Sequence, residues 1–198
     1  MGRSLRAEQV QQTRGALIAA GRRLFGQRGF AGTSVEDLAH QARVTTGALY
    51  HHFPTKRALF EEVVEELHRE LSAASTAAAE EEDDPIEALS RGVEAFLDAV
   101  LQPAVQQVLV TDAPAVLGMA RSIELDERHA VTAVEAALRR AAGAGRLDID
   151  DPAVLAPLLL GALTRGAMLI AGAADPTTTR DAVARGIRGL LRGLRPAP

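Results

Sequence analysis

The sequence contains no cysteine and no tryptophan, and aromatic residues make up only 3% of the chain. Without cysteine, neither a disulfide framework nor a thiolate metal site can form, and a cytoplasmic protein is expected. No apolar run follows the first arginines, so we expect no export signal. Alternating β-branched runs long enough for a sheet are also lacking, while helical spacing recurs throughout. These absences favour a soluble, all-α protein, and 198 residues suffice for a substantial core.

Catalytic patterns are equally scarce. No Ser/His/Asp arrangement, metal-ligand set or phosphate-binding glycine loop is apparent, and the acidic run at residues 61–66 is typical of a solvated helix face. Adjacent residues of a helix point about 100° apart, so His51 and His52 make a poor chelate. We therefore expect no enzyme, no cofactor and no metal site.

Positive charge is concentrated at the start of the chain. Residues 1–60 contain nine basic and three acidic residues, whereas the whole chain has a net charge of −4. Codon bias can raise the number of arginines everywhere, but it does not separate the two signs of charge. A basic segment on an acidic body suggests that the segment meets nucleic acid.

Helical periodicity and capping patterns divide this basic segment into short helices. The first helix is expected near residues 13–27. The motif "TSVE" predicts that Thr33 caps a second helix, with Glu36 reaching back to it. A third short helix is expected near residues 45–52, ended by Pro54, and a long fourth helix follows.

The acidic run from Glu80 to Pro85, "EEEDDP", predicts a loop, because the carboxylates repel one another and proline begins rather than continues a helix. Beyond this loop, helices are expected near residues 86–102, 104–117, 123–142, 152–171 and 178–194.

The apolar segment of residues 152–174 is long enough to raise the question of a membrane span. Arg165 lies in its middle, where a charge costs about 2.5 to 3.5 kcal/mol on insertion scales. A helix buried between its own core and a partner subunit is the simpler interpretation, and no membrane is expected.

The second and third expected helices have the layout of a helix-turn-helix, whose second helix turns one face to the core and the other to the major groove. The third helix has an apolar stripe and a polar stripe. The apolar stripe comprises Val44, Ala48, Leu49 and Phe53, and the polar one comprises Thr45, Thr46, Gly47, Tyr50 and His51. Hydroxyl and imidazole groups suit contacts with DNA, and glycine permits close approach.

Three further residues complete the expected DNA contacts. Lys56 begins the fourth helix, where free N–H groups and the helix dipole already favour a phosphate. Thr33 has the same geometry at the second helix, and Arg43 lies in the turn. The alternative is an ordinary helical hairpin, in which Thr45 is only an N-cap and Tyr50 only packs.

The segment "TSVEDLAHQARVTTGALYHHFPTKRALF" closely resembles the DNA-binding domain of TetR-family transcriptional regulators. Residues 12–62 fit the family pattern, although many members carry a threonine or serine at the position of Ala48. The most specific matches are Gly29-Phe30, Thr33, Gly47, Leu49-Tyr50, Phe53 and Lys56. The resemblance implies a helix-turn-helix domain at residues 1–60 and a helical effector-binding and dimerisation domain at residues 61–198.

The resemblance further implies a homodimer in which the last two helices of each subunit form a four-helix bundle. Both expected helices independently offer small residues and apolar spacing for close packing. Such a dimer would be a repressor on a palindromic double-stranded DNA operator, released by a small-molecule effector. The alternative is a constitutive dimeric DNA-binding protein without an effector.

Five of the six aromatic residues lie in residues 1–60, so an effector pocket would have aliphatic walls rather than an aromatic cage. Asp112 either orients an effector or caps the turn at Pro114. Arg121 and Arg165 either bind an anionic group of the effector or form salt bridges. Met119 and Met168 belong either to the pocket or to the core. The candidate effector residues are Phe96, Val100, Asp112, Met119, Arg121, Arg165 and Met168.

Overall fold

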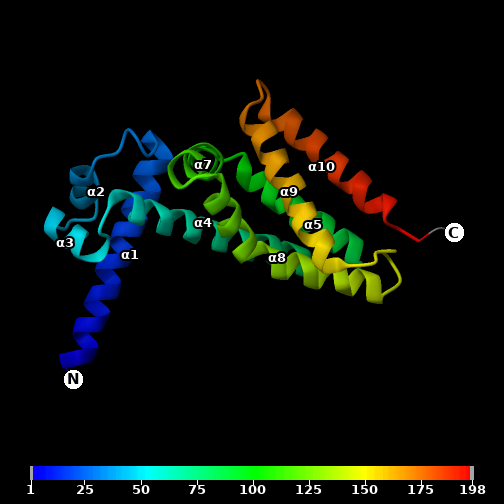
Figure 1. Ribbon diagram of the computed structural model, residues 1–198, viewed down its shortest axis with the longest axis horizontal. Helices are drawn as coiled ribbons and strands as arrows, with labels where there is room; N and C mark the ends of the chain where they lie inside the picture. Colours follow the sequence, from blue (N-terminus) through cyan, green and yellow to red (C-terminus); the bar gives the residue numbers. More distant parts are fainter. Residues whose placement is uncertain (1, 197–198) are drawn as a thin grey trace. The chain divides into compact units, whose positions relative to one another are not determined.

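The computed structural model describes residues 2–196, which contain helices and no strand, so the all-α prediction is confirmed. The chain forms two compact units. The first comprises Met1–Leu67 together with Pro103–Arg121, and the second comprises His68–Gln102 together with Ser122–Pro198. Figure 1 shows the helices in chain order. The segment from Pro103 to Arg121 therefore packs with the expected DNA-binding helices, although it is distant from them in the sequence.

The first unit contains the helix-turn-helix. Its elements are α1 (Gly2–Arg28), α2 (Val35–Gln41), α3 (Thr46–His52), the beginning of α4 (Lys56–Glu80), α6 (Pro103–Val105), the π-helical segment η1 (Gln106–Asp112) and α7 (Ala113–Leu117). The prediction that the first helix begins at Thr13 is wrong, because α1 begins at Gly2. The added turns are polar and rich in good helix formers, so they lack the apolar periodicity from which a start can be predicted.

Three phenylalanine rings hold the centre of the first unit. Phe25 and Phe60 are fully buried and meet edge to face, with 5.2 Å between their ring centroids. Phe30 stacks on Phe25 at 5.8 Å and contacts Phe60 at 5.1 Å. Each such pair contributes about 0.5 to 1.5 kcal/mol beyond the area it buries. The rings thereby join α1, α4 and the loop that leads into α2.

The predicted cap of the second helix is displaced by one residue. Ser34, and not Thr33, is the N-cap of α2: its hydroxyl accepts a hydrogen bond from the Asp37 N–H at 3.0 Å, and the Asp37 carboxylate accepts one from the Ser34 N–H at 3.4 Å. Hydrogen bonding of the Ser34 side chain and of its backbone N–H to the Asp37 carboxylate lowers the pKa of that carboxyl. Thr33 is buried instead, and its hydroxyl donates to the Gly29 carbonyl at 2.9 Å, satisfying the end of α1.

The second unit contains the remainder of α4, α5 (Pro85–Val100), most of α8 (Met119–Gly143), α9 (Pro152–Ala171) and α10 (Pro176–Gly193). The predicted loop at the acidic run is confirmed between α4 and α5. Three of these helices, α5, α9 and α10, begin with the dipeptide Asp-Pro, in which aspartate caps the helix and proline occupies its first turn.

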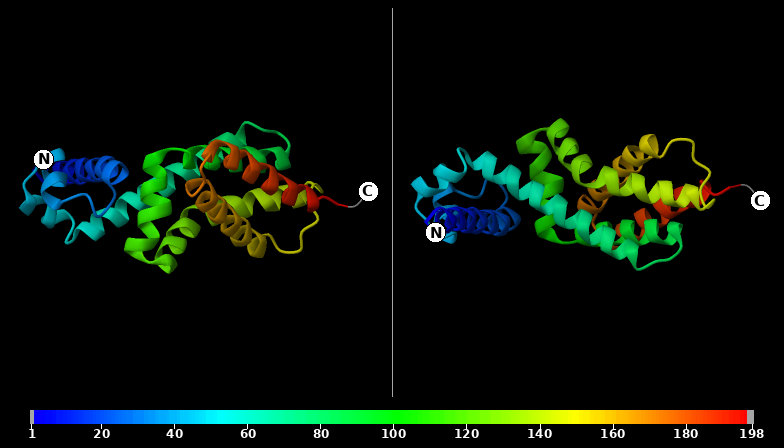
Figure 2. Two further views of the ribbon diagram at one scale, coloured as in Figure 1. Left: turned by 90° about the horizontal axis from the view of Figure 1, so that it is seen from above. Right: turned by 90° about the horizontal axis from the view of Figure 1, so that it is seen from below.

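The apolar helix α9 packs against both α5 and α10, and Figure 1 and the left view of Figure 2 show α9 and α10 side by side. By length and composition α9 alone among the described helices could cross a membrane, with a mean hydropathy of 1.8. One such helix is weak support for a span. Its contacts on two sides instead agree with a helix of a protein core.

Candidate nucleic-acid interface and ligand cavity

Helix α3 has the two stripes that the sequence predicts. Leu49 is fully buried and Phe53 is 3% exposed, while Thr46, Tyr50 and His51 are exposed to solvent. Their separation follows from the helical period, which returns residues three and four apart to the same face. The helix therefore carries a free polar face opposite the side that anchors it.

A side-chain hydrogen bond sets the N-terminal end of α3. Thr45 is the N-cap, and its hydroxyl accepts a hydrogen bond from the Ala48 N–H at 3.1 Å. Gly47 lies in the first turn, where an added Cβ would meet only the Thr45 hydroxyl, 3.8 Å away. Because Gly47 has no side chain, the backbone of the first turn of α3 can approach another surface closely.

Arg43 forms the turn between α2 and α3 in the left-handed conformation, with a φ of 57°. A residue with a Cβ is strained there by about 1 kcal/mol or more. The Arg43 N–H donates to the His40 carbonyl at 3.1 Å, and its side chain is exposed. A strained arginine beside the polar face of α3 adds positive charge at the position where DNA contacts are expected.

Lys56 is placed differently from the sequence expectation of a phosphate contact. Its ammonium donates hydrogen bonds to the carbonyls of Phe30 and Thr33, both at 2.8 Å, and lies 4.1 Å from the centroid of the Phe30 ring. Two of its three N–H groups are therefore used inside the unit. Like the buried hydroxyl of Thr33, the ammonium holds the loop between α1 and α2.

The two neighbouring histidines of α3 have ring centroids 5.5 Å apart and lie edge to face. Among residues 2–196, no group of three or more histidine, cysteine or acidic side chains is placed to hold a metal ion.

Three contacts join the segment around α7 to the helix-turn-helix. The Asp112 carboxylate accepts a hydrogen bond from the Phe30 N–H at 2.7 Å, the Arg57 guanidinium donates to the Leu117 carbonyl at 3.2 Å, and Arg121 pairs with Glu61 at 2.7 Å. Of the two roles predicted for Asp112, a side-chain cap of the turn at Pro114 is wrong, because Asp112 is the N-cap residue of α7 but its side chain makes no cap hydrogen bond.

A cavity of about 420 Å³ lies in the second unit, between α4, α5, α8 and α9. Its walls are mainly aliphatic, and Phe96 is the aromatic residue in its lining. Val100, Arg165 and Met168 belong to the same unit, but none of them lines this cavity. Val100 is buried in the core and Arg165 is exposed to solvent. Asp112, Met119 and Arg121 belong to the first unit.

The cavity has a polar group that sequence reasoning missed. The Thr164 hydroxyl lies 2.9 Å from Oδ2 of Asp126, and Nδ1 of His68 lies 3.6 Å from its Oδ1. In the sequence, Asp126 stands in a run of charged residues typical of a solvated helix face. Asp126 lines the cavity only because α4, α8 and α9 pack together around it.

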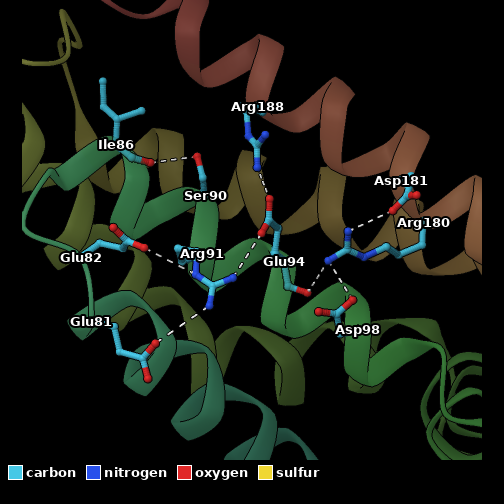
Figure 3. Close-up of polar contacts among 10 residues, drawn as sticks. All are labelled: Glu81, Glu82, Ile86, Ser90, Arg91, Glu94, Asp98, Arg180, Asp181 and Arg188. Carbon is cyan, nitrogen blue, oxygen red and sulfur yellow. Dashed lines mark hydrogen bonds and ion pairs between the residues drawn. The ribbon is translucent and has the colours of Figure 1, made fainter.

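Helix α5 is shared between the cavity and α10. Leu89, Val93 and Phe96 line the cavity, whereas Glu94 and other polar residues of α5 form ion pairs with α10. Figure 3 shows the two pairs between these helices, Arg188 with Glu94 and Arg180 with Asp98, together with neighbouring pairs that do not cross from α5 to α10. The neighbouring pairs are Arg91 with Glu81, Glu82 and Glu94, and Arg180 with Asp181. If a bound molecule moved α5, the ion pairs between α5 and α10 would transmit that movement to α10.

Comparison with known proteins gives concordant matches. Residues 17–63 match "Bacterial regulatory proteins, tetR family", and residues 86–194 match "Tetracyclin repressor-like, C-terminal domain". The HTH-type transcriptional regulator TtgR of Pseudomonas putida is 30% identical over 85% of this chain and 86% of its own length. The HTH-type transcriptional repressor KstR2 of Mycobacterium tuberculosis is 43% identical over 32% of this chain and 30% of its own.

A solved structure extends the agreement to the fold. A transcriptional regulator from Pectobacterium atrosepticum is 34% identical, has a TM-score of 0.85, and is matched over 96% of this chain and 98% of its own. The likeness covers both compact units.

Proposed function

Because the chain belongs to the TetR family of transcriptional regulators, we propose that it is a cytoplasmic repressor that binds a near-palindromic operator as a homodimer and leaves it when a small molecule fills the cavity. Regulators of this family bind DNA operators and are generally dimeric and responsive to small molecules. The observation that carries the proposal is the exposed polar face of α3, anchored from behind by Leu49 and Phe53.

The DNA contacts that we assign come from α3 and the turn before it. The threonine and tyrosine hydroxyls and the imidazole suit phosphates and base edges, the arginine suits phosphate or guanine, and the glycine brings the backbone near the groove. The assigned residues are Arg43, Thr45, Thr46, Gly47, Tyr50 and His51. Lys56 and Thr33 support DNA binding indirectly, because they hold the loop that positions α2.

The dimer surface that we assign lies on the outer faces of α9 and α10. Leu158 and Leu190 are 65% and 61% exposed, which is unusual for leucines of a stable core. Gly161 and Gly189 are exposed beside them, and nothing lies within 4 Å of a Cβ added at either position. Small residues between exposed leucines allow two helix pairs to pack closely, and a second copy would cover these apolar side chains.

The effector site that we assign is the cavity of the second unit. Its volume of about 420 Å³ lies within the usual range for small-molecule sites. A molecule that binds the two states of the dimer unequally shifts it toward the state it prefers, here one in which the two α3 helices no longer match the operator. The α5 ion pairs with α10 offer a route from the cavity to the dimer surface.

The test is selection of bound sequences from random duplex DNA, followed by affinity measurements on the selected site. We expect the selected site to be a near-palindrome. Wild type should bind it and Gly47→Leu should not, because Gly47 is exposed, a Cβ there meets nothing closer than 3.8 Å, and the larger side chain would stand between α3 and the groove. Gly15→Leu is the matched control, since Gly15 is exposed on α1 and also has open space at its Cβ.

A monomeric protein, or one that ignores double-stranded DNA at low ionic strength, would refute the proposal. A dimer that binds its operator but responds to no compound in a broad library would instead establish the constitutive alternative.

A further inference from the structure

We propose that the cavity selects an elongated, largely apolar molecule whose uncharged or cationic polar end donates an O–H or N–H hydrogen bond to Asp126, and that it discriminates against anions. The inference rests on the proposed function, because it assigns a chemical class to the effector. It is carried by the length of the cavity, by the hydrogen-bonding capacity of Asp126 and by the charge of the lining.

The cavity follows α4 lengthwise. His68 meets Asp126 at one end, and one turn further on the Ser72 hydroxyl donates to the His129 carbonyl at 2.6 Å, so α4 and α8 run in the same direction along the cavity. The lining continues on α4 as far as Glu80. Because a helix rises 1.5 Å per residue, this stretch is about 18 Å long. A chain-like or multi-ring molecule fits such a space better than a compact one.

Asp126 is the natural acceptor for a ligand donor. Its carboxylate offers about four lone-pair sites. The Thr164 hydroxyl lies 2.9 Å from it but also 3.0 Å from the Leu160 carbonyl, so one proton is shared between two acceptors. Nδ1 of His68, at 3.6 Å, is beyond good hydrogen-bonding distance. The carboxylate therefore has capacity for a further donor, and bonds to a charged acceptor are short and strong.

The charge of the lining opposes an anionic ligand. Four carboxylates line the cavity, against Arg140 as the one arginine in its lining. The excess stays negative even if His68 is protonated. The carboxylates are Glu80, Glu82, Asp83 and Asp126. A ligand carboxylate placed beside Asp126 would meet a like charge across aliphatic walls, where screening by water is weak.

The experiment measures binding of three matched ten-carbon probes to the full-length protein by calorimetry, below their aggregation concentrations. The probes are decan-1-ol, decylammonium and decanoate. We expect the alcohol and the ammonium to bind about tenfold or more tightly than decanoate. Asp126→Asn should weaken decylammonium by about tenfold to a hundredfold, which is what one hydrogen bond to a charged group contributes.

The control is Glu127→Gln, which removes the neighbouring carboxylate on the exposed side of α8, outside the lining. It should leave the three affinities unchanged. Decanoate binding as tightly as the other two probes, a preference that survives Asp126→Asn, or no binding by any probe would overturn the inference.

Operator binding by the same preparations, without a probe, separates the inference from the proposed function. Loss of operator binding with the probe preference intact would refute the regulator proposal and leave the cavity assignment standing.

Discussion

The carboxylate of Asp112 accepts a hydrogen bond from the backbone N–H of Phe30, 82 residues earlier in the chain, with 2.7 Å between Oδ2 and N. The carbonyl of the same Phe30 accepts a hydrogen bond from the Lys56 ammonium at 2.8 Å. Both polar groups of one loop residue are thus held by side chains distant in sequence. The loop that leads into the helix-turn-helix is positioned by tertiary contacts as well as by its own turn.

Replacing Asp112 tests this relationship. Asp112→Ala leaves the partly buried Phe30 N–H without its acceptor, so we expect the free energy of unfolding to fall by about 1 to 3 kcal/mol. Asp112→Asn retains a carbonyl oxygen as acceptor and should lose less. Chemical denaturation of both variants measures the difference, and equal stability of all three proteins would show that the contact is not significant.

Lys56→Met removes two hydrogen bonds to carbonyls while keeping a long apolar chain. We expect a stability loss of about 1.5 to 3 kcal/mol and little change in the slope of log affinity against log salt, because the ammonium is engaged within the protein. The measurement is operator binding at several salt concentrations. A slope reduced by about one would instead show that Lys56 contacts a phosphate directly.

Gly26 lies where α1 meets α6, and an added Cβ would stand 2.8 Å from the Cβ of Ala104. Because the Ala104 methyl group cannot rotate away, Gly26→Ala should destabilise the first unit by about 1 to 3 kcal/mol. Combining it with Ala104→Gly should restore part of the loss. Gly15→Ala, on the same helix with open space, should stabilise by about 0.4 to 1 kcal/mol. Thermal unfolding of the four proteins checks the set.

Asp175 caps α10, and hydrogen bonds from Thr178 lower its pKa from the ordinary value of 3.8. The unfolded state then takes up the proton first as the pH falls. The stability contributed by this carboxylate is present above pH 3.8 and is lost as the pH falls through the lower, folded-state pKa. Asp175→Asn keeps a good N-cap without this titration. Acid denaturation should therefore show a smaller loss of stability in the variant, and identical pH profiles would contradict the assignment.

Leu158→Glu and Leu190→Glu test the dimer surface. Each places a charge on an exposed position of the monomer, so the fold should survive, whereas a dimer would have to bury that charge. We expect the dissociation constant of the dimer to rise at least about tenfold, measured by sedimentation at several protein concentrations. Met119→Glu, at an exposed apolar residue outside α9 and α10, is the control. Unchanged dimers in both leucine variants would place the interface elsewhere.

The N-cap of α2 shows how much of a helix boundary can be predicted from the local sequence. The motif around Thr33 and Ser34 contains two overlapping capping boxes, one beginning at each residue, and local rules allow both. The choice of Ser34 follows from the burial of Thr33 against the Gly29 carbonyl, which a sequence pattern does not contain. The start of α1 could not be predicted for a related reason, because the sequence before Thr13 shows no apolar periodicity that would mark a helix.

By itself the sequence determined the all-α class, the loop at the acidic run, the extent of α9 and which side of α3 faces the core. All of these depend on interactions between residues at most four apart, and spacing alone records them. Tertiary structure alone decided that Asp112 holds Phe30, that Lys56 is turned inward and that Asp126 lines a cavity. Each of these depends on packing between helices that lie tens of residues apart in the chain, which local periodicity does not encode.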